Sequence, residues 1–184
     1  MRIIAGKARS LPLKTISGEH TRPTTDRIKE TLFNMLNPIL PGCCFLDLFA
    51  GSGQIGLEAV SRGANKAVFV EQNRKAALCI EENIKFTKFT EECKLLNMDA
   101  IAGIRRLDGT QVFDVVFMDP PYAQEMEQDV LKALADSSLI TRDTLLVIET
   151  ALSTDFSYLE ELGYLITKEK KYKTNMHVFI KLVS

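Results

Sequence analysis

The chain has 184 residues, of which 46% are hydrophobic and 26% are charged, and its formal net charge is −1 at pH 7. This length suits one α/β domain with a short extension. No apolar stretch approaches the roughly 20 residues of a membrane helix, and the first residues lack a signal-peptide layout, which excludes those classes. Four cysteines without a CxxC pair and two histidines argue against a metal site. We therefore expect a cytoplasmic monomer without a metal ion.

Residues 1–40 are predicted to form a basic arm and a helix. A loose alternation indicates a hairpin in the first 15 residues, and Thr24-Thr25-Asp26 opens a helix that ends near Leu36. Residues 1–30 carry seven basic and three acidic side chains, so the arm is positive on an otherwise acidic body. This asymmetry favours a polyanionic partner such as nucleic acid, although a solvated tail would carry the same charge.

Residues 41–184 are predicted to form a Rossmann-like domain in which strands alternate with helices. The expected strands are residues 44–48, 67–70, 94–98, 114–118 and 144–149, and the expected helices are 54–62, 74–85, 100–107, 124–135 and 156–161. This alternation predicts a parallel, doubly wound α/β sheet. The last two strands, 164–171 and 176–182, leave no room for a helix, so we expect an antiparallel hairpin that completes a mostly parallel seven-stranded sheet. A second basic cluster lies in this hairpin and comprises Lys168, Lys170, Lys171 and Lys173.

A glycine-rich loop follows the first strand of this domain. The segment from Asp47 to Gly56 contains the pattern G-x-G-x-x-G between a strand and a helix, and Glu71 lies twenty residues beyond Gly51. This context favours a cofactor that contains adenosine, with Glu71 on the ribose hydroxyls. The loop alone is compatible with both NAD and S-adenosylmethionine.

Carboxylates at the ends of successive strands favour the methyl donor. Asp47, Glu71, Asp99 and Asp119 follow four strands whose carboxyl ends should share one edge of the sheet. Such a group suits a cationic sulfonium and an ammonium, with Asp99 available to the adenine amino group, whereas it would repel a pyrophosphate. For any single one of these acids, a strand-end cap or a solvated turn residue would be the better explanation.

The segment Asp119-Pro120-Pro121-Tyr122 follows an apolar run and is typical of a site that holds a flat amino group. The Asp119 carboxylate and the Pro120 carbonyl can both accept hydrogen bonds from one NH2 group. The prolines stiffen the turn, and the Tyr122 ring offers a face on which a base can stack. The alternative is an ordinary Pro-Pro turn after a strand.

Several longer segments carry a resemblance to a known family. They are Arg2-Ile-Ile-Ala-Gly6, the arm segment from Thr21 to Asn34, the run from Phe45 to Gly53, Gly56-Leu-Glu-Ala59, Ser61-Arg-Gly-Ala64 and Met118-Asp-Pro-Pro-Tyr122. These segments resemble the RsmD family of bacterial small-subunit (16S) ribosomal RNA guanine-N2 methyltransferases over nearly the whole chain. The resemblance implies a class I S-adenosylmethionine-dependent methyltransferase that modifies a guanine of 16S RNA in a partly assembled small ribosomal subunit.

The motifs and the resemblance together give a set of expected site residues. The catalytic residues are Asp119, Pro120 and Tyr122; the cofactor residues are Asp47, Phe49, Gly51, Gly53, Glu71, Gln72, Asp99, Ala100 and Asp119; the RNA contacts are Arg22, Arg27, Lys29, Lys7 and Arg9. Other classes remain open. A DNA adenine-N6 or cytosine-N4 methyltransferase usually needs an added target-reading region, an NAD oxidoreductase leaves Asp-Pro-Pro-Tyr unexplained, and a non-catalytic RNA-binding module leaves the strand-end acids unexplained.

Overall fold

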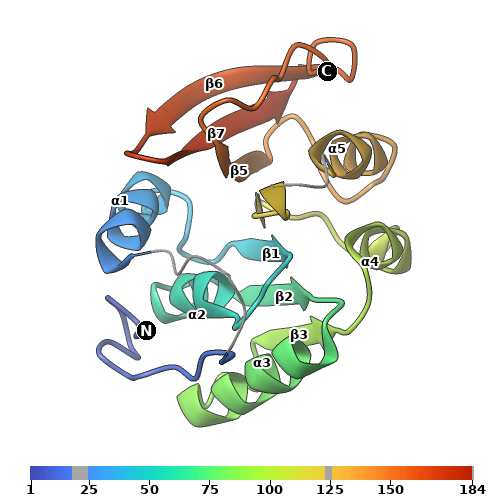
Figure 1. The fold of residues 1–184 in the computed structure, drawn as a ribbon. Coiled ribbons are helices and arrows are strands. Elements are labelled where there is room, and N and C mark those ends of the chain that lie inside the picture. Colours follow the sequence, from blue (N-terminus) through green and yellow to red (C-terminus); the bar gives the residue numbers. More distant parts are fainter. Residues whose placement is uncertain (18–24, 123–125, 184) are drawn as a thin grey trace.

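The computed structural model describes residues 1–17, 25–122 and 126–183 (Figure 1). The elements are α1 (Asp26–Leu36), β1 (Cys44–Leu48), α2 (Gln54–Ser61), β2 (Lys66–Val70), α3 (Arg74–Thr87), β3 (Cys93–Leu96), α4 (Ala100–Leu107), β4 (Val115–Met118), α5 (Glu127–Ala135), β5 (Leu145–Ala151), β6 (Tyr164–Lys171) and β7 (Asn175–Leu182). All seven predicted strands are confirmed. None of the described helices is long and apolar enough to cross a membrane.

Two local predictions differ from the structure in whole or in part. The helix expected at residues 156–161 is wrong, because this stretch consists of turns. The Asp155 carboxylate accepts hydrogen bonds from the amide and hydroxyl of Ser157, both at 2.9 Å, and thereby offers the backbone a turn instead of a helix. The hairpin expected in the first 15 residues is present in a short form: one antiparallel bridge joins Arg2 and Pro12, and backbone hydrogen bonds beside it run from Ile3 to Leu11, from Ser10 to Ile3 and from Leu13 to Met1.

The seven strands form one sheet in the order β3-β2-β1-β4-β5-β7-β6. Strands β1 to β5 pair in parallel, whereas β7 lies antiparallel between β5 and β6. The predicted α/β class, with a mostly parallel sheet and a closing antiparallel hairpin, is therefore confirmed. The strand order reverses between β1 and β4, which is the place where open α/β sheets bind their ligands.

Helices cover both faces of the sheet (Figure 1). Alternate strand residues such as Phe45, Phe69 and Phe117 pack with α1, α2 and α3 in one core cluster. Their neighbours, such as Leu46 and Met118, pack with α4 and α5 in the other. Because successive side chains of a strand point to opposite faces, the strands that are buried on both sides read as continuous apolar runs.

The N-terminal arm and α1 belong to the first of these cores. Ile3, Leu13 and Phe33 are buried in the same cluster as Phe45 of β1. The Ile4 amide also donates to both carboxylate oxygens of Glu58 in α2, at 3.0 Å each. Residues 1–17 and α1 are thus packed onto the sheet, and the division at residue 40 stays a prediction about function.

Candidate active site

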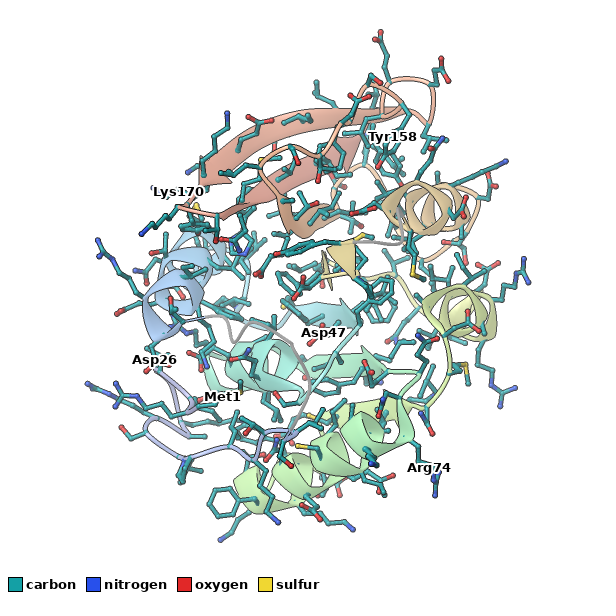
Figure 2. The ribbon with its side chains drawn as sticks, in the orientation of Figure 1. Met1, Asp26, Asp47, Arg74, Tyr158 and Lys170 are labelled. Atoms are coloured by element: carbon teal, nitrogen blue, oxygen red, sulfur yellow. The ribbon has the colours of Figure 1, made fainter. Side chains whose placement is uncertain are left out.

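A cleft of about 700 Å³ opens where β1, β2 and β4 end, at the point where the strand order reverses. Its lining includes Asp47 of β1 and eight residues from the loops that follow these strands: Phe49, Ala50, Gly51, Ser52, Glu71, Gln72, Asp119 and Pro121. Figure 2 shows Asp47 near the centre of the molecule, on β1, which lies between β2 and β4 in the sheet. Of the expected cofactor residues, Asp47, Phe49, Gly51, Glu71, Gln72, Ala100 and Asp119 lie in this cleft.

The glycine loop turns sharply between β1 and α2. Phe49, Gly51 and Gly53 have φ values of 61°, 58° and 83°, in the region that glycine tolerates best. Gly53 precedes α2 and does not line the cleft. A Cβ on Gly56 would lie 2.4 Å from a ring carbon of Phe69, so the glycine allows α2 to approach β2 closely. This approach brings the start of α2 to the cleft, where Gln54 and Ile55 form part of the wall.

Asp47 is the most deeply buried carboxyl group of the cleft. Its exposed fraction is 1%, and it accepts a hydrogen bond from the Gly56 amide at 3.2 Å. Burial raises the pKa of Asp47 to about 8; the Gly56 bond opposes this rise, and the charge of Glu71 adds to it. A buried carboxyl group at a cleft wall favours a cationic ligand, because a cation there would stabilise the ionised form.

Glu71 fixes the loop against the end of β2. Its two carboxylate oxygens accept from the amides of Gly51, at 3.1 Å, and Asn73, at 3.3 Å. The Asn97 side chain in turn donates to the carbonyls of Glu71, at 2.8 Å, and Gln72, at 3.2 Å. This network holds the Glu71 carboxylate in the cleft, and carboxylate oxygens are acceptors that suit hydroxyl groups.

The structure brings together three of the four acids expected at strand ends, and Asp99 is the exception. Asp99 caps α4, where its Oδ1 accepts from the Ala102 amide at 2.9 Å, and it does not line the cleft. Its neighbours Met98 and Ala100 line the cleft instead. Asp99 therefore has the local capping role that was the alternative for any single acid, and its contact with adenine stays a prediction.

Asp119 follows β4 on the same face of the sheet as Asp47. Burial raises the pKa of Asp119 well above its usual range, and the nearby charges of Glu149 and Asp47 raise it further. Pro121 lines the cleft and Pro120 is buried, whereas Tyr122 is 47% exposed. The motif thus joins a buried carboxyl group with a raised pKa to an aromatic ring at the surface.

A row of polar side chains beside Asp119 was missed by the sequence analysis. In the sheet register Met118 lies next to Ile148, which places Asp119 next to Glu149, and Glu149 lies opposite His177. The His177 Nε2 and a Glu149 oxygen are 3.0 Å apart, and neither residue is more than 5% exposed. Glu149 could have been found, because it ends a predicted strand as Asp47 and Asp119 do.

The N-terminal segment forms another wall of the cleft that the sequence did not indicate. This wall consists of Met1, Thr15, Ile16, Thr25 and Asp26. Figure 2 shows Met1 and Asp26 on the same side of Asp47. The Ser52 hydroxyl lies 3.3 Å from the Met1 sulfur, which ties the arm to the glycine loop. The arm was expected to contact RNA, but part of it encloses the cofactor cleft.

The described residues that were expected to contact RNA lie in different parts of the molecule. The prediction for Lys29 is wrong, because its side chain has no exposed surface and its Nζ donates to the Arg2 carbonyl. Lys7 is exposed but lies near the amino ends of the strands, where its Nζ is 3.3 Å from Glu92; Arg9 follows in the same turn. Arg27 is exposed on α1 beside the cleft wall, and Arg22 lies outside the described residues.

Comparisons with known proteins identify the family. Residues 1–181 match the family model described as "Conserved hypothetical protein 95". The ribosomal RNA small subunit methyltransferase D of Haemophilus influenzae is 34% identical over 171 residues, which cover 92% of this chain and 88% of that protein. The protein of the same name from Escherichia coli K12 is 34% identical over 150 residues, 82% of this chain and 74% of that one. This chain belongs to the RsmD family.

Solved structures support the same assignment. The candidate methyltransferase yhhF of Escherichia coli superposes with a TM-score of 0.84 at 29% identity, over 99% of this chain and 97% of that one. A conserved hypothetical protein of Streptococcus pyogenes gives a TM-score of 0.76 at 40% identity, over 84% of this chain and 94% of that one. The resemblance seen in the motifs is thus confirmed, together with the class I methyltransferase fold of the RsmD family.

Proposed function

We propose that this RsmD-family protein transfers the methyl group of S-adenosylmethionine to the exocyclic N2 of a guanine in 16S ribosomal RNA, within an assembling small subunit in the cytoplasm. The observation that carries the proposal is the meeting of two carboxyl groups, Asp47 in the cofactor cleft and Asp119 at the Asp-Pro-Pro-Tyr turn, on one face of the sheet. The names of the relatives supply the class of RNA.

The residues of the cleft fit S-adenosylmethionine. Asp47 would hold the ammonium group, and Glu71 would accept from the ribose hydroxyls. Val70, Met98 and Ala100 give this part of the lining an apolar surface that suits an adenine ring. When bound, the cofactor supplies an electrophilic methyl group. The buried Asp47 would stabilise the positive charge of the ammonium group, since its own ionisation is unfavourable without a cation nearby.

Asp119 would act directly on the target nitrogen. The lone pair of guanine N2 is delocalised into the ring, so the nitrogen is a weak nucleophile until its geometry changes. Hydrogen bonds from its two N–H groups to the Asp119 carboxylate and the Pro120 carbonyl would favour a more tetrahedral nitrogen. N2 gains a methyl group and must lose one proton, and the raised pKa of Asp119 makes its carboxylate a suitable acceptor.

Tyr122 would hold the target base in place. Its ring is about half exposed next to Asp119, which suits stacking on a base that has left its helix. Positioning of the base and of the two acceptors would then supply most of the rate enhancement.

The test is transfer of labelled methyl to three substrates: naked 16S RNA, small subunits that lack the modification, and duplex DNA. Digestion to nucleosides should show N2-methylguanosine from RNA or subunits. Asp119→Asn should bind the cofactor and transfer no label. Label in DNA, or no label anywhere despite cofactor binding, would contradict the proposal.

A further inference from the structure

A second groove, of about 350 Å³, separates the first half of α1 from the turn between β6 and β7. We call it the hairpin groove; it is lined by Thr25, Arg27, Ile28, Thr31, Lys170, Lys171, Tyr172 and Lys173. Figure 2 shows Lys170 at the end of the hairpin next to α1. Four of these described lining residues are basic and none is acidic, so the groove is strongly positive in a chain whose net charge is −1.

The four cations of the hairpin groove are exposed and lack ion pairs within the described part of the chain. Three nearby acids do not line the groove. Asp26 pairs with Arg2 at 3.0 Å, and Glu149 bonds to His177. Glu169 precedes Lys170 on β6 and is exposed. The groove therefore holds positive charge that a bound anion would neutralise.

The sheet register connects the hairpin groove to the catalytic motif. Lys170 lies opposite His177, His177 lies opposite Glu149, and Glu149 lies beside Asp119. Three strand spacings of about 4.8 Å place Lys170 roughly 14 Å from Asp119. This distance suits the phosphates of nucleotides that neighbour a base held at Asp119.

Two residues make the groove continuous with the active site. Thr25 lines both the hairpin groove and the cofactor cleft. The hydroxyl of Tyr172, which also lines the groove, lies 3.1 Å from the Nδ1 of His177, in the row of side chains that ends at Asp119. A strand that places its base in the active site would therefore lead into the groove.

We propose that the hairpin groove binds backbone phosphates of the RNA strand that carries the target nucleotide. This inference rests on the proposed function and adds where the substrate strand lies. Lysines and arginine neutralise phosphates without reading sequence, so the groove sets position and affinity while the Asp-Pro-Pro-Tyr site selects the base. A protein partner fits less well, because lysine is depleted in protein–protein interfaces and Ile28 is the only aliphatic residue in the described lining.

The decisive experiment compares two double variants that each remove two positive charges. Lys170→Gln/Lys173→Gln alters the groove. Lys85→Gln/Lys132→Gln is the matched control, because both lysines are exposed in the last turns of α3 and α5, away from the groove. Methyl transfer to naked 16S RNA would be measured as KM and kcat from low to high salt, with binding of S-adenosylmethionine measured by calorimetry.

The groove variant should raise the KM for RNA about tenfold and leave kcat and cofactor affinity unchanged. The slope of log KM against log salt should fall by about 1.4, which is about 0.7 for each lost contact with single-stranded RNA. The control variant should change the KM less than about twofold and keep the slope. If both variants behave alike, the groove does not bind RNA.

Two further outcomes are decisive. An effect on methylation of assembled subunits without an effect on naked RNA would assign the groove to a ribosomal protein and overturn the proposal. If the wild-type protein transfers no methyl to RNA, the proposed function fails. Direct binding of naked 16S RNA by the same two variants, with its salt slope, then decides for or against the groove independently.

Discussion

Two groups of buried charges lie on the same side of the sheet, and they differ in how they are satisfied. Around α2, Lys29 donates to the Arg2 carbonyl, and Glu58 accepts from the Ile4 amide and pairs with Arg62 at 3.3 Å. Burial lowers the pKa of Lys29 and raises that of Glu58, and in each case the charge of the other residue opposes the shift.

Asp47 and Asp119, which line the cleft, have no such neighbouring cation among the described residues. For Asp47 and Asp119, burial and neighbouring negative charges both raise the pKa. The first group holds the arm against the domain. In the second group, ionisation of Asp47 and Asp119 is unfavourable, and a bound cationic ligand would stabilise their ionised forms. Buried charge alone therefore does not mark a functional site; buried charge without a counterion, facing a cleft, does.

The largest expected effect is the loss of methyl transfer on substitution of Asp119, one of the two cleft acids without a neighbouring cation. Asp119→Asn should reduce single-turnover methyl transfer at least about 10³-fold, because the amide cannot accept the proton from N2. The Kd for S-adenosylmethionine, measured by calorimetry, should change only a few-fold. An equally large loss of cofactor binding would instead place Asp119 in the cofactor site.

Substitutions among the paired charges around α2 should lower the stability of the protein. Lys29→Met removes one of the two cations beside Glu58 and the donor to the Arg2 carbonyl, so the free energy of unfolding in urea should fall by about 3 kcal/mol. Arg27→Met, an exposed change on the same helix, is the matched control and should stay within about 0.5 kcal/mol. A small effect at Lys29 would show that the buried network is not needed to hold the arm.

Asp47→Asn should have opposite effects on binding and on stability. Cofactor affinity should fall about 30-fold with the loss of a charged partner for the ammonium. The folded protein binds one proton more at Asp47 than the unfolded chain does between about pH 4 and pH 8, so stability falls as pH rises through this range. Asparagine has no charge to bury, and the Tm without cofactor at pH 8.5 should rise by about 2 to 5 °C. No rise at pH 8.5 would show that Asp47 carries no penalty when ionised.

The smallest effect concerns the neighbour of Asp119. Glu149→Gln removes a negative charge that raises the pKa of Asp119, so the acidic limb of the kcat profile should move to lower pH, by about half a unit. Glu169→Gln on the exposed strand β6 should leave the profile unchanged. A shift toward higher pH would contradict the assigned electrostatic role of Glu149.

The sequence predicts those features that are local in the chain. Asp47, Glu71 and Asp119 were found because each follows an apolar run that could only be a buried strand. The position of the arm is harder to predict, because it depends on residues that are distant in the sequence. Lys29 has the sequence context of a surface cation, but in the structure its Nζ donates to the Arg2 carbonyl and to the Gln54 side chain. His177 gave no signal, because its meaning comes from lying opposite Glu149 in the register of β5 and β7.

The position of β7 also sets an order for chain assembly. Because β7 lies between β5 and β6, the sheet cannot be completed until residues 175–182 have been synthesised. The described residues that line the cofactor cleft all lie within residues 1–121 and precede this step. A growing polypeptide would therefore contain every described residue of the cleft lining before the strand that completes the hairpin, and a nascent chain that lacks this strand would not yet offer the groove to RNA.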